Sequence, residues 1–223
     1  MLPDTTSLLE DPLKYLPCST VFDYTKGQAI YSPDQPSASI YLVVDGKVKV
    51  RRVTEGGRQV LVGIYIPDEF FGESAFLGLS TEFAEAFEDG AKVMAWTIRE
   101  IEEIAKLRPK LAIALLQLIT RRSMDFSSRI ESFSVDNIAR RLARALILFS
   151  ERMGKETEDG SVHMRPLTHE LLAQYIGTSR EIVNHYMNQF RRQGYLQYSQ
   201  RDIQLHRGAL QEWLRQKTEK PEE

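Results

Sequence analysis

The chain has 223 residues, 42% hydrophobic side chains and a net charge of -2, which is enough for two modest domains with cores of their own. No apolar run reaches the about 18 residues of a membrane helix, and the acidic start MLPDTTSLLEDPLKYLP is unlike a secretory signal, so we expect a cytoplasmic protein without membrane contact. Cys18 is the single cysteine, which excludes an internal disulfide framework and an iron-sulfur cluster held within one chain. We expect Cys18 to be a half-buried small apolar residue.

The charge is unevenly distributed along the chain. Residues 1–135 carry 15 Lys and Arg against 19 Asp and Glu, a net charge of -4, whereas residues 136–223 carry 14 against 12, a net charge of +2. All four histidines lie in the second part. A weakly basic C-terminal part beside an acidic N-terminal part is consistent with nucleic-acid binding by the former.

Residues 40–71 show the period of two that is typical of β-strands. SIYLVVDGKVKVRRV alternates around Val44, Gly46, Val48 and Val50, and RQVLVGIYI alternates around Val60, Val62, Ile64 and Ile66. Asp45-Gly46 and Glu55-Gly56-Gly57 can each reverse the chain between adjacent strands. The pattern predicts a small antiparallel barrel or roll.

A long helix follows, because an apolar and basic stripe recurs there at spacings of three and four. Such a stripe either packs on the protein's own sheet or pairs with a second copy of the chain. The arginines and serines in its second half favour the homodimer, with the interface formed by Leu111, Leu115, Leu118, Arg122, Phe126, Arg129 and Phe133.

A second helix is predicted in DNIARRLARALILFSERMG, capped by Ser134 or Asp136 and stopped by Gly154. Residues 133–136 then form a hinge between the two helices. We therefore expect an α+β chain with three parts, a β-roll sensor domain over residues 1–109, a dimerisation helix and hinge over 110–135, and a DNA-binding domain over 136–223.

The segment LTHELLAQYIGTSREIVNHYMNQF has the pattern of a helix-turn-helix. Ala173 lets two helices approach closely, Gly177 suits the tight turn, and each helix has an inward face formed by Leu172, Ile176, Val183 and Met187. Downstream, GYLQYSQRDIQLH predicts two short strands, residues 195–198 and 203–205, around a polar turn. A helix-turn-helix followed by a hairpin is a winged helix.

The second helix of this motif is expected to start near Thr178 or Ser179 and to enter a major groove of DNA. Thr168 and Ser179 are the expected N-caps of the two helices. Its exposed face offers base contacts from Arg180, Glu181, Asn184 and His185. Groups that can reach phosphates belong to Thr168, Thr178, Ser179, Arg191, Arg192 and Arg201. Thr178 and Glu181 alternatively form only a capping box, and His185 is alternatively a merely exposed side chain.

The order of these parts resembles the family of the cyclic-AMP receptor protein and the fumarate-nitrate reduction regulator. The resemblance covers residues 15–215 and rests on a Gly-rich roll, PDEFFGE, the long helix and TSREIVNHYMNQFRRQGYL. It implies a homodimeric transcription regulator that binds a near-palindromic operator in double-stranded DNA and acts on RNA polymerase. In that family the positions matching Arg180 and Glu181 contact bases, and the position matching His185 is usually arginine, which puts the usual half-site in doubt at one step.

The sensor departs from the cyclic-nucleotide-binding members. In those members a Gly-Glu pair is followed about ten residues later by Arg-Ser, which holds the cyclic phosphate. Here Gly72 and Glu73 are present, but Phe83-Ala84 or Ala84-Glu85 replaces Arg-Ser, and acidic side chains surround the position. An anionic phosphate without a cation is disfavoured, so we do not expect cyclic AMP to bind in the family's manner. Glu73 then caps the following turn or forms hydrogen bonds within the roll.

The remaining possibilities for the sensor are an uncharged or apolar effector, or no effector at all. The pocket for an effector would contain Gly72, Glu73, Phe83, Phe126 and Ser127, the last two matching the family's adenine-binding pair. No haem is expected, since residues 1–135 contain no histidine, and no metal site or other cofactor is indicated.

Two other classes of protein compete with the DNA-binding regulator. An enzyme is not expected, because the chain has no metal-ligand cluster, phosphate-binding loop or nucleophile elbow. A ligand-binding regulatory subunit whose helical end contacts protein is the second alternative. Salt separates it from a DNA binder, whose affinity falls steeply as salt rises.

Overall fold

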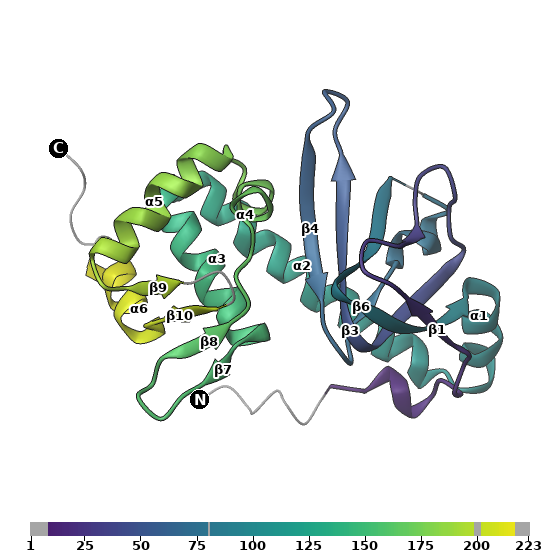
Figure 1. Ribbon diagram of the computed structural model, residues 1–223. Helices are drawn as coiled ribbons and strands as arrows, with labels where there is room; N and C mark the ends of the chain where they lie inside the picture. The colour runs from purple at the N-terminus through teal and green to yellow at the C-terminus, as the bar shows by residue number, and fades with distance from the viewer. Residues whose placement is uncertain (1–8, 80, 199–201, 217–223) are drawn as a thin grey trace. The chain divides into compact units, whose positions relative to one another are not determined.

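The computed structural model describes residues 9–79, 81–198 and 202–216. The chain forms two compact units, Met1–Arg129 and Ile130–Glu223, each with its own sheet and helices (Figure 1). The division falls inside the long helix, so the segment predicted as a separate dimerisation part is shared between the two units.

The first unit is an antiparallel roll, as predicted. Its sheet has the order β1-β6-β3-β4, with β2 paired to β6 and β5 paired to β3. The strands are β1 (Val21–Tyr24), β2 (Ala29–Tyr31), β3 (Ser39–Val53), β4 (Gln59–Tyr65), β5 (Phe70–Phe71) and β6 (Glu82–Thr97). Four stacked or tilted aromatic rings fill part of the interior: Tyr31, Tyr41, Tyr65 and Phe71.

The turn predicted at Asp45-Gly46 is wrong, because β3 continues through it as one strand of 15 residues. The pairing of β3 with β6 instead shifts register there, and a Cβ atom at Gly46 would lie 2.2 Å from the carbonyl oxygen of Gly90. Before this bulge the expected faces are exchanged, so Val43 is buried and Val44 is exposed, whereas Val48 and Val50 beyond it are buried as expected. The second predicted turn, at residues 55–57, does join β3 to β4, with Gly57 at a φ of 74°.

Strand β4 shows a second shift of faces. Register changes between Val50 and Arg51 of β3, and as a result Leu61 is fully buried whereas Val60 is exposed. Ahead of the roll lies the short helix η2 (Pro12–Lys14), and the following Cys18 is exposed, contrary to the expectation of a half-buried thiol.

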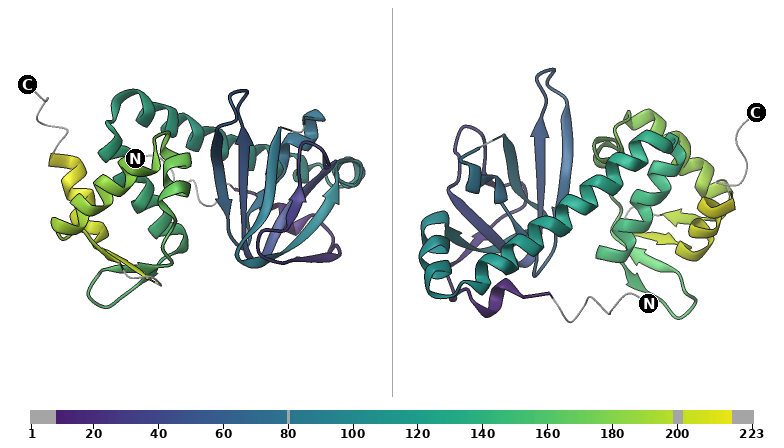
Figure 2. Two further views of the ribbon diagram at one scale, coloured as in Figure 1. Left: turned by 45° about the horizontal axis from the view of Figure 1, so that its top comes forward. Right: turned by 180° about the vertical axis from the view of Figure 1, so that it is seen from behind.

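Two helices follow the roll in sequence. Helix α1 (Ile98–Leu107) starts with a capping box in which Thr97 and Glu100 satisfy each other's backbone N–H groups. Helix α2 (Lys110–Val135) is one unbroken helix of 26 residues (Figure 2). A short 3-10 helix, η3 (Glu73–Leu77), interrupts the roll between β5 and β6.

The predicted dimer stripe of α2 is wrong over much of its length, since it packs on the protein's own roll. Leu111 is 0% exposed, and it forms a core with Leu115, Trp96 and Phe70 against which Leu118 also packs. Farther along, Arg122 donates to the carbonyl oxygen of Phe70 (2.6 Å). Arg129 donates to the carbonyl oxygens of Leu61 (3.0 Å) and Val62 (3.3 Å). Only Phe126 and Phe133 of the stripe are exposed.

The second unit holds a small sheet of order β7-β8-β10-β9 with helices beside it (Figure 1). Its elements are α3 (Ile138–Met153), β7 (Lys155–Glu156), β8 (Val162–Met164), α4 (His169–Ile176), α5 (Arg180–Arg192), β9 (Leu196–Tyr198), β10 (Ile203–Leu205) and α6 (Arg207–Gln216). The predicted winged helix-turn-helix is thereby confirmed.

The start of α3 differs from its prediction. Asn137 is the N-cap, since its side chain accepts a hydrogen bond from the backbone N–H of Arg140 (3.0 Å), so neither Ser134 nor Asp136 caps the helix. Gly154 does end it. Residues 133–135 belong to α2, which narrows the break between the two helices to Asp136 and Asn137.

Candidate nucleic-acid interface

Helices α4 and α5 form the predicted helix-turn-helix around a dry inner face. The four predicted inward residues are all buried, namely Leu172, Ile176, Val183 and Met187. At the corner, Gly177 has a φ of 71°, and the N–H groups of Gly177 and Thr178 both donate to the carbonyl oxygen of Ala173. This left-handed glycine ends α4 and turns the chain into α5.

The start of α5 is capped by Ser179, whose hydroxyl accepts from the backbone N–H of Ile182 (3.4 Å). Ser179 is thus the N-cap, as predicted, and the alternative of a capping box that starts at Thr178 is wrong. The Thr178 hydroxyl has no hydrogen-bond partner among the described residues, and because it is buried a phosphate cannot reach it. Thr168 caps α4 in the ordinary way, accepting from the N–H of Leu171 (3.2 Å), and stays exposed.

All four predicted base-reading residues lie on the exposed part of α5: Arg180, Glu181, Asn184 and His185. Hydrogen bonds from its own backbone N–H and from the Ser179 hydroxyl lower the pKa of the Glu181 carboxyl, which keeps it an acceptor. Asn184 receives the side-chain amide of Asn188 on its backbone carbonyl (2.9 Å), which leaves its own amide N–H groups for an outside partner. The first two turns of α5 thus present donors and acceptors that can read base edges.

The two predicted arginines at the end of α5 are exposed as well. The guanidinium of Arg191 lies over the ring of Tyr198 (5.5 Å), and Tyr198 also meets the edge of His169 (6.4 Å). Burial and the nearby Arg180 lower the pKa of His169. Arg192 is exposed, and Arg201 lies outside the described residues. Tyr198 on the wing thus joins the start of α4 to the end of α5, a contact that no local sequence pattern predicts.

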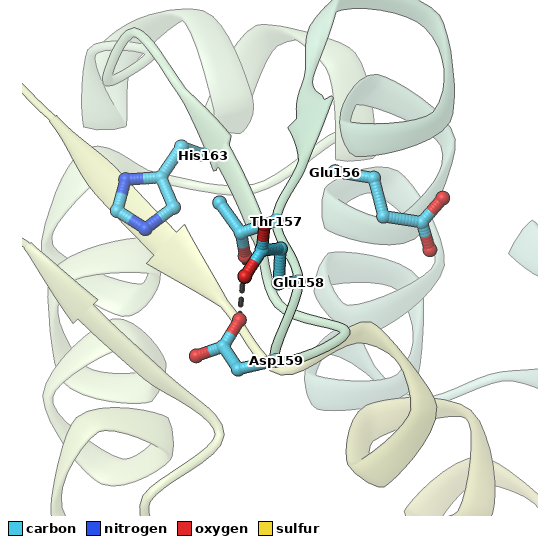
Figure 3. Close-up of a pocket in the computed structure, with 5 residues that line it drawn as sticks. All are labelled: Glu156, Thr157, Glu158, Asp159 and His163. Atoms are coloured by element: carbon cyan, nitrogen blue, oxygen red, sulfur yellow. Dashed lines mark hydrogen bonds between the residues drawn. The ribbon is translucent and has the colours of Figure 1, made fainter.

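The hairpin of β7 and β8 carries an acidic group of side chains beside the winged helix (Figure 3). Asp159 accepts from Thr157 (2.5 Å), from the Ser161 hydroxyl (2.7 Å) and from the Ser161 N–H (3.0 Å), and these hydrogen bonds lower its pKa. Glu156 and His163 point to opposite sides of the hairpin (Figure 3). The carboxylate of Asp159 therefore stabilises a turn, and within residues 9–79, 81–198 and 202–216 no group of three His, Cys, Asp or Glu is placed to hold a metal ion.

In the roll, the predicted effector residues are differently engaged. Gly72 has a φ of 87° and lies against the ring of Tyr41. Glu73 forms an ion pair with Arg122, whose guanidinium also lies over Tyr65 (4.8 Å). Of the two roles expected for Glu73, bonding inside the unit is the one observed, because η3 has Gly72 as its N-cap and no side-chain cap.

The other residues predicted to line an effector pocket, Phe126, Ser127 and Phe83, form no hydrogen bond or ring contact with Glu73 or Arg122 in the described part of the chain. Phe126 and Ser127 are on the exposed part of α2, and the Ser127 hydroxyl donates to the carbonyl oxygen of Ser123 (2.9 Å). Phe83 is half-buried on β6, opposite Arg51. No cation stands at the Phe83-Ala84 position itself.

The sequence implied an open negative patch of acidic side chains on β6, but the structure does not show one. Glu82, Glu85 and Glu88 are paired with cations on the neighbouring strand β3, in the ion pairs Lys47–Glu88, Lys49–Glu85, Arg51–Glu85 and Arg52–Glu82, with separations from 2.6 to 2.8 Å. The charges cancel locally, and the basic side chains nearest to the Phe83 position are occupied by carboxylates.

Comparison with known proteins gives the class to which this arrangement belongs. Residues 21–107 match the cyclic nucleotide-binding domain, and residues 140–213 match the Crp-like helix-turn-helix domain. A roll of the first kind joined to a helix-turn-helix of the second defines a DNA-binding transcription regulator. The helices within the described residues include none that is long and apolar enough to cross a membrane.

The relatives identify the family. Transcriptional regulator SdrP of Thermus thermophilus is 30% identical over 185 residues, which cover 82% of this chain and 87% of SdrP. The CRP-like cAMP-activated global transcriptional regulator of Mycobacterium tuberculosis is 25% identical over 81% of both chains. A solved regulator of the CRP/FNR family from Thermus thermophilus superposes with a TM-score of 0.72 at 27% identity, covering 88% of this chain and 98% of the other. The chain belongs to the CRP/FNR family of transcription regulators, and these relatives are regulators, not enzymes, as predicted.

Proposed function

We propose that the chain works as a homodimer that reads a near-palindromic operator with the N-terminal half of α5. The observation that carries this proposal is the exposed polar face at the start of α5, set on a buried inner face and a capped, left-handed corner. Arg180 can donate two hydrogen bonds to a guanine, and Glu181 can accept from a cytosine. Thr168, Ser179, Arg191 and Arg192 are then the phosphate contacts, together with Arg201 beyond the described residues.

A second stripe on α2 supports the homodimer. Residues 112, 116, 119, 123, 126, 130 and 133 follow strict spacings of four and three, and five of them are large apolar side chains that remain exposed, namely Leu116, Ile119, Phe126, Ile130 and Phe133. We call this set of seven positions the seam. A heptad-like seam of this length is buried most simply against the same seam of a second copy. Such a dimer would set two recognition helices about one turn of DNA apart, roughly 34 Å.

We infer further that the roll does not bind cyclic AMP in the family's manner. The relatives include proteins named as cAMP-activated and as a cyclic AMP receptor protein. In this chain, however, Glu73 is held by Arg122, and Arg51 is held by Glu85. A cyclic phosphate would have to be buried without a free cation, which is strongly unfavourable. The regulator is then active without an effector, or responds to an uncharged one.

The experiment that tests the operator proposal is selection of binding sites from random duplex DNA by the purified protein, without any added ligand. The expected winner is a near-palindrome whose affinity falls steeply with salt, because counterions are released from the contacted phosphates. Its composition at the step facing His185 would show which base that residue prefers. Binding that shows neither enrichment nor dependence on salt would refute DNA recognition and favour a subunit that contacts protein.

The same preparation tests the sensor. Cyclic AMP added to the operator complex should leave the dissociation constant unchanged. A tightening of the complex at concentrations where cyclic AMP itself binds would show that the ion pair of Glu73 and Arg122 opens to admit it.

A further inference from the structure

The helix-turn-helix corner is held from outside by two side chains that belong to neither of its helices. Arg141 of α3 donates from Nη1 to the carbonyl oxygen of Ile176 (3.0 Å), at the last turn of α4. Carbonyls at this end of a helix have no partner within the helix, and a cation near them is favoured by the helix dipole. Arg141 therefore caps α4 from a different helix.

Phe133 completes this arrangement from the last turn of α2. Its ring lies under the guanidinium of Arg141 (5.1 Å), and its Cε1 atom lies 3.0 Å from the place where a Cβ atom of Gly177 would be. A side chain at position 177 would therefore crowd the ring of Phe133 and force it to shift, in addition to straining a φ of 71°. We call Phe133, Arg141 and Gly177 the corner clamp.

The position of the Arg141 side chain is explained neither by contact with solvent nor by attraction to a neighbouring acid. The Nε atom of Arg141 is buried and has no hydrogen-bond partner in the described part of the chain. The neighbouring acid, Asp136, pairs with Arg140 and Arg144. Among the described residues Arg141 therefore forms no ion pair, and its Nη1 atom donates to the carbonyl oxygen at the corner instead. This indicates that Arg141 holds α4 and α5 in position.

We propose that Phe133 and Arg141 are positioning residues that couple the end of α2 to the recognition helix and thereby set the operator spacing that the dimer accepts. This inference rests on the proposed function. Phe133 is the last residue of the seam, so a rotation of α2 at the dimer interface moves the side chain that packs on Gly177. The direction of α5 then follows the dimer interface through contacts of side chains, in addition to the covalent link at Asp136 and Asn137.

The test uses the selected operator and derivatives in which the two half-sites are moved closer or farther by one base pair. For wild type, the matched spacing should bind most tightly. Arg141→Met removes the donor to Ile176 and keeps the length of the side chain. We expect it to reduce the ratio of affinities between matched and altered spacing about fivefold, the equivalent of about one lost hydrogen bond.

Matched variants separate the clamp from general effects. Arg215→Gln removes an exposed arginine of the same unit that pairs only at 3.9 Å with Glu212, and its spacing ratio should equal that of wild type. Phe133→Leu should lower the ratio as Arg141→Met does, and the double variant should lower it no further. Arg141 lies off the seam, so sedimentation of Arg141→Met should still report a dimer. If Arg141→Met fails to fold, Arg141→Lys, which keeps the charge but not the planar stacking, replaces it.

Each outcome decides one of the two proposals. A smaller ratio for Arg141→Met, with base discrimination at each half-site preserved, supports the clamp. An equal loss of affinity on every spacing, or an unchanged ratio, overturns the clamp and leaves the proposed function intact. A wild-type protein that selects no operator overturns the proposed function and the clamp with it.

Discussion

The carboxylate of Asp136 is expected to be a main source of stability for the second unit. Its side chain is 3% exposed, and it accepts hydrogen bonds from Arg140 Nε (2.7 Å), Arg144 Nε (2.6 Å) and the Ser132 hydroxyl (2.8 Å). Arg140 donates in addition to the carbonyl oxygen of Leu214 on α6 (2.9 Å). The substitution Asp136→Asn keeps the shape but removes the charge and one of the two acceptor oxygens.

The expected loss follows from the exposure of the partners. A hydrogen bond to a charged group contributes about 1.5–3 kcal/mol when buried, which applies to the pair with Arg140. The Arg144 side chain is 51% exposed, so its pair is screened and contributes about 1 kcal/mol or less. We therefore expect Asp136→Asn to lower the free energy of unfolding by about 2–4 kcal/mol and Arg144→Ala by about 1 kcal/mol or less.

The two tryptophans allow each unit to be followed separately. Trp96 lies in the first unit and Trp213 in the second, and both are buried. In a Trp96→Phe background, urea unfolding monitored by fluorescence reports on the second unit alone. A free energy within about 0.5 kcal/mol of the background for Asp136→Asn would refute the assignment, because surface substitutions produce changes of that size.

The pH dependence gives an independent check on the same carboxylate. Burial by itself would raise the pKa of Asp136, but the hydrogen bonds from Arg140, Ser132 and Arg144 outweigh it, and the pKa is lowered. A lowered pKa stabilises the fold fully above the pKa of the unfolded chain, about 3.9, and this stabilisation is lost as the pH falls through the folded value. The difference between wild type and Asp136→Asn should thus be constant near neutral pH and shrink below about pH 4.

Three further predictions concern the operator and the roll. Arg180→Ala should weaken operator binding by about 1–3 kcal/mol per contact and relax the preference for guanine at one symmetric position, as measured by competition with base-substituted operators; a preference that persists in the variant would reject the contact. Arg122→Met should destabilise the roll by about 1–3 kcal/mol, because it leaves the Glu73 carboxylate unpaired, and Trp96 fluorescence should register the loss; an unchanged midpoint would mean that water replaces the guanidinium. Burial and Arg180 lower the pKa of His169, whereas a DNA phosphate nearby would raise it. Operator binding should therefore tighten as the pH falls from about 7.5 to 5.5 in wild type but not in His169→Gln. Equal pH dependence in both proteins would place His169 away from the phosphates.

The helix-turn-helix and its wing could be predicted almost completely from the sequence, because the sequence patterns that specify them are local. The inward residues of α4 and α5, the glycine at the corner and the two wing strands depend on residues within a few positions of one another. Ser179 is the N-cap of α5, as predicted, and only the alternative start at Thr178 is wrong, since two neighbouring hydroxyl residues satisfy the same rule. Only the backbone geometry decides which of them faces the N–H of Ile182.

The roll was predicted less well, because its bulges depend on contacts far apart in sequence. Asp45-Gly46 satisfies the rule for a turn, yet Gly46 is required by the close approach of Gly90 on a strand some 40 residues away. A single extra residue at a bulge then moves every following side chain to the other face. The exposure of Val44 and Val60 and the burial of Val43 and Leu61 follow directly.

On α2 the predicted helical stripe exists, but the surface that covers it is the roll and not a second copy of the chain. Two stripes run along α2 with spacings of three and four: the stripe through Leu111 and Leu115 contacts the roll, and the seam through Leu116 and Ile130 is exposed. In the sequence, the arginines at 122 and 129 argue against a dry internal position, and for that reason the sequence favours a partner chain as the surface that covers the first stripe. Both arginines instead bond to carbonyl oxygens of the roll. A buried guanidinium is tolerated where the backbone supplies acceptors, and such acceptors can be found only once the fold is known.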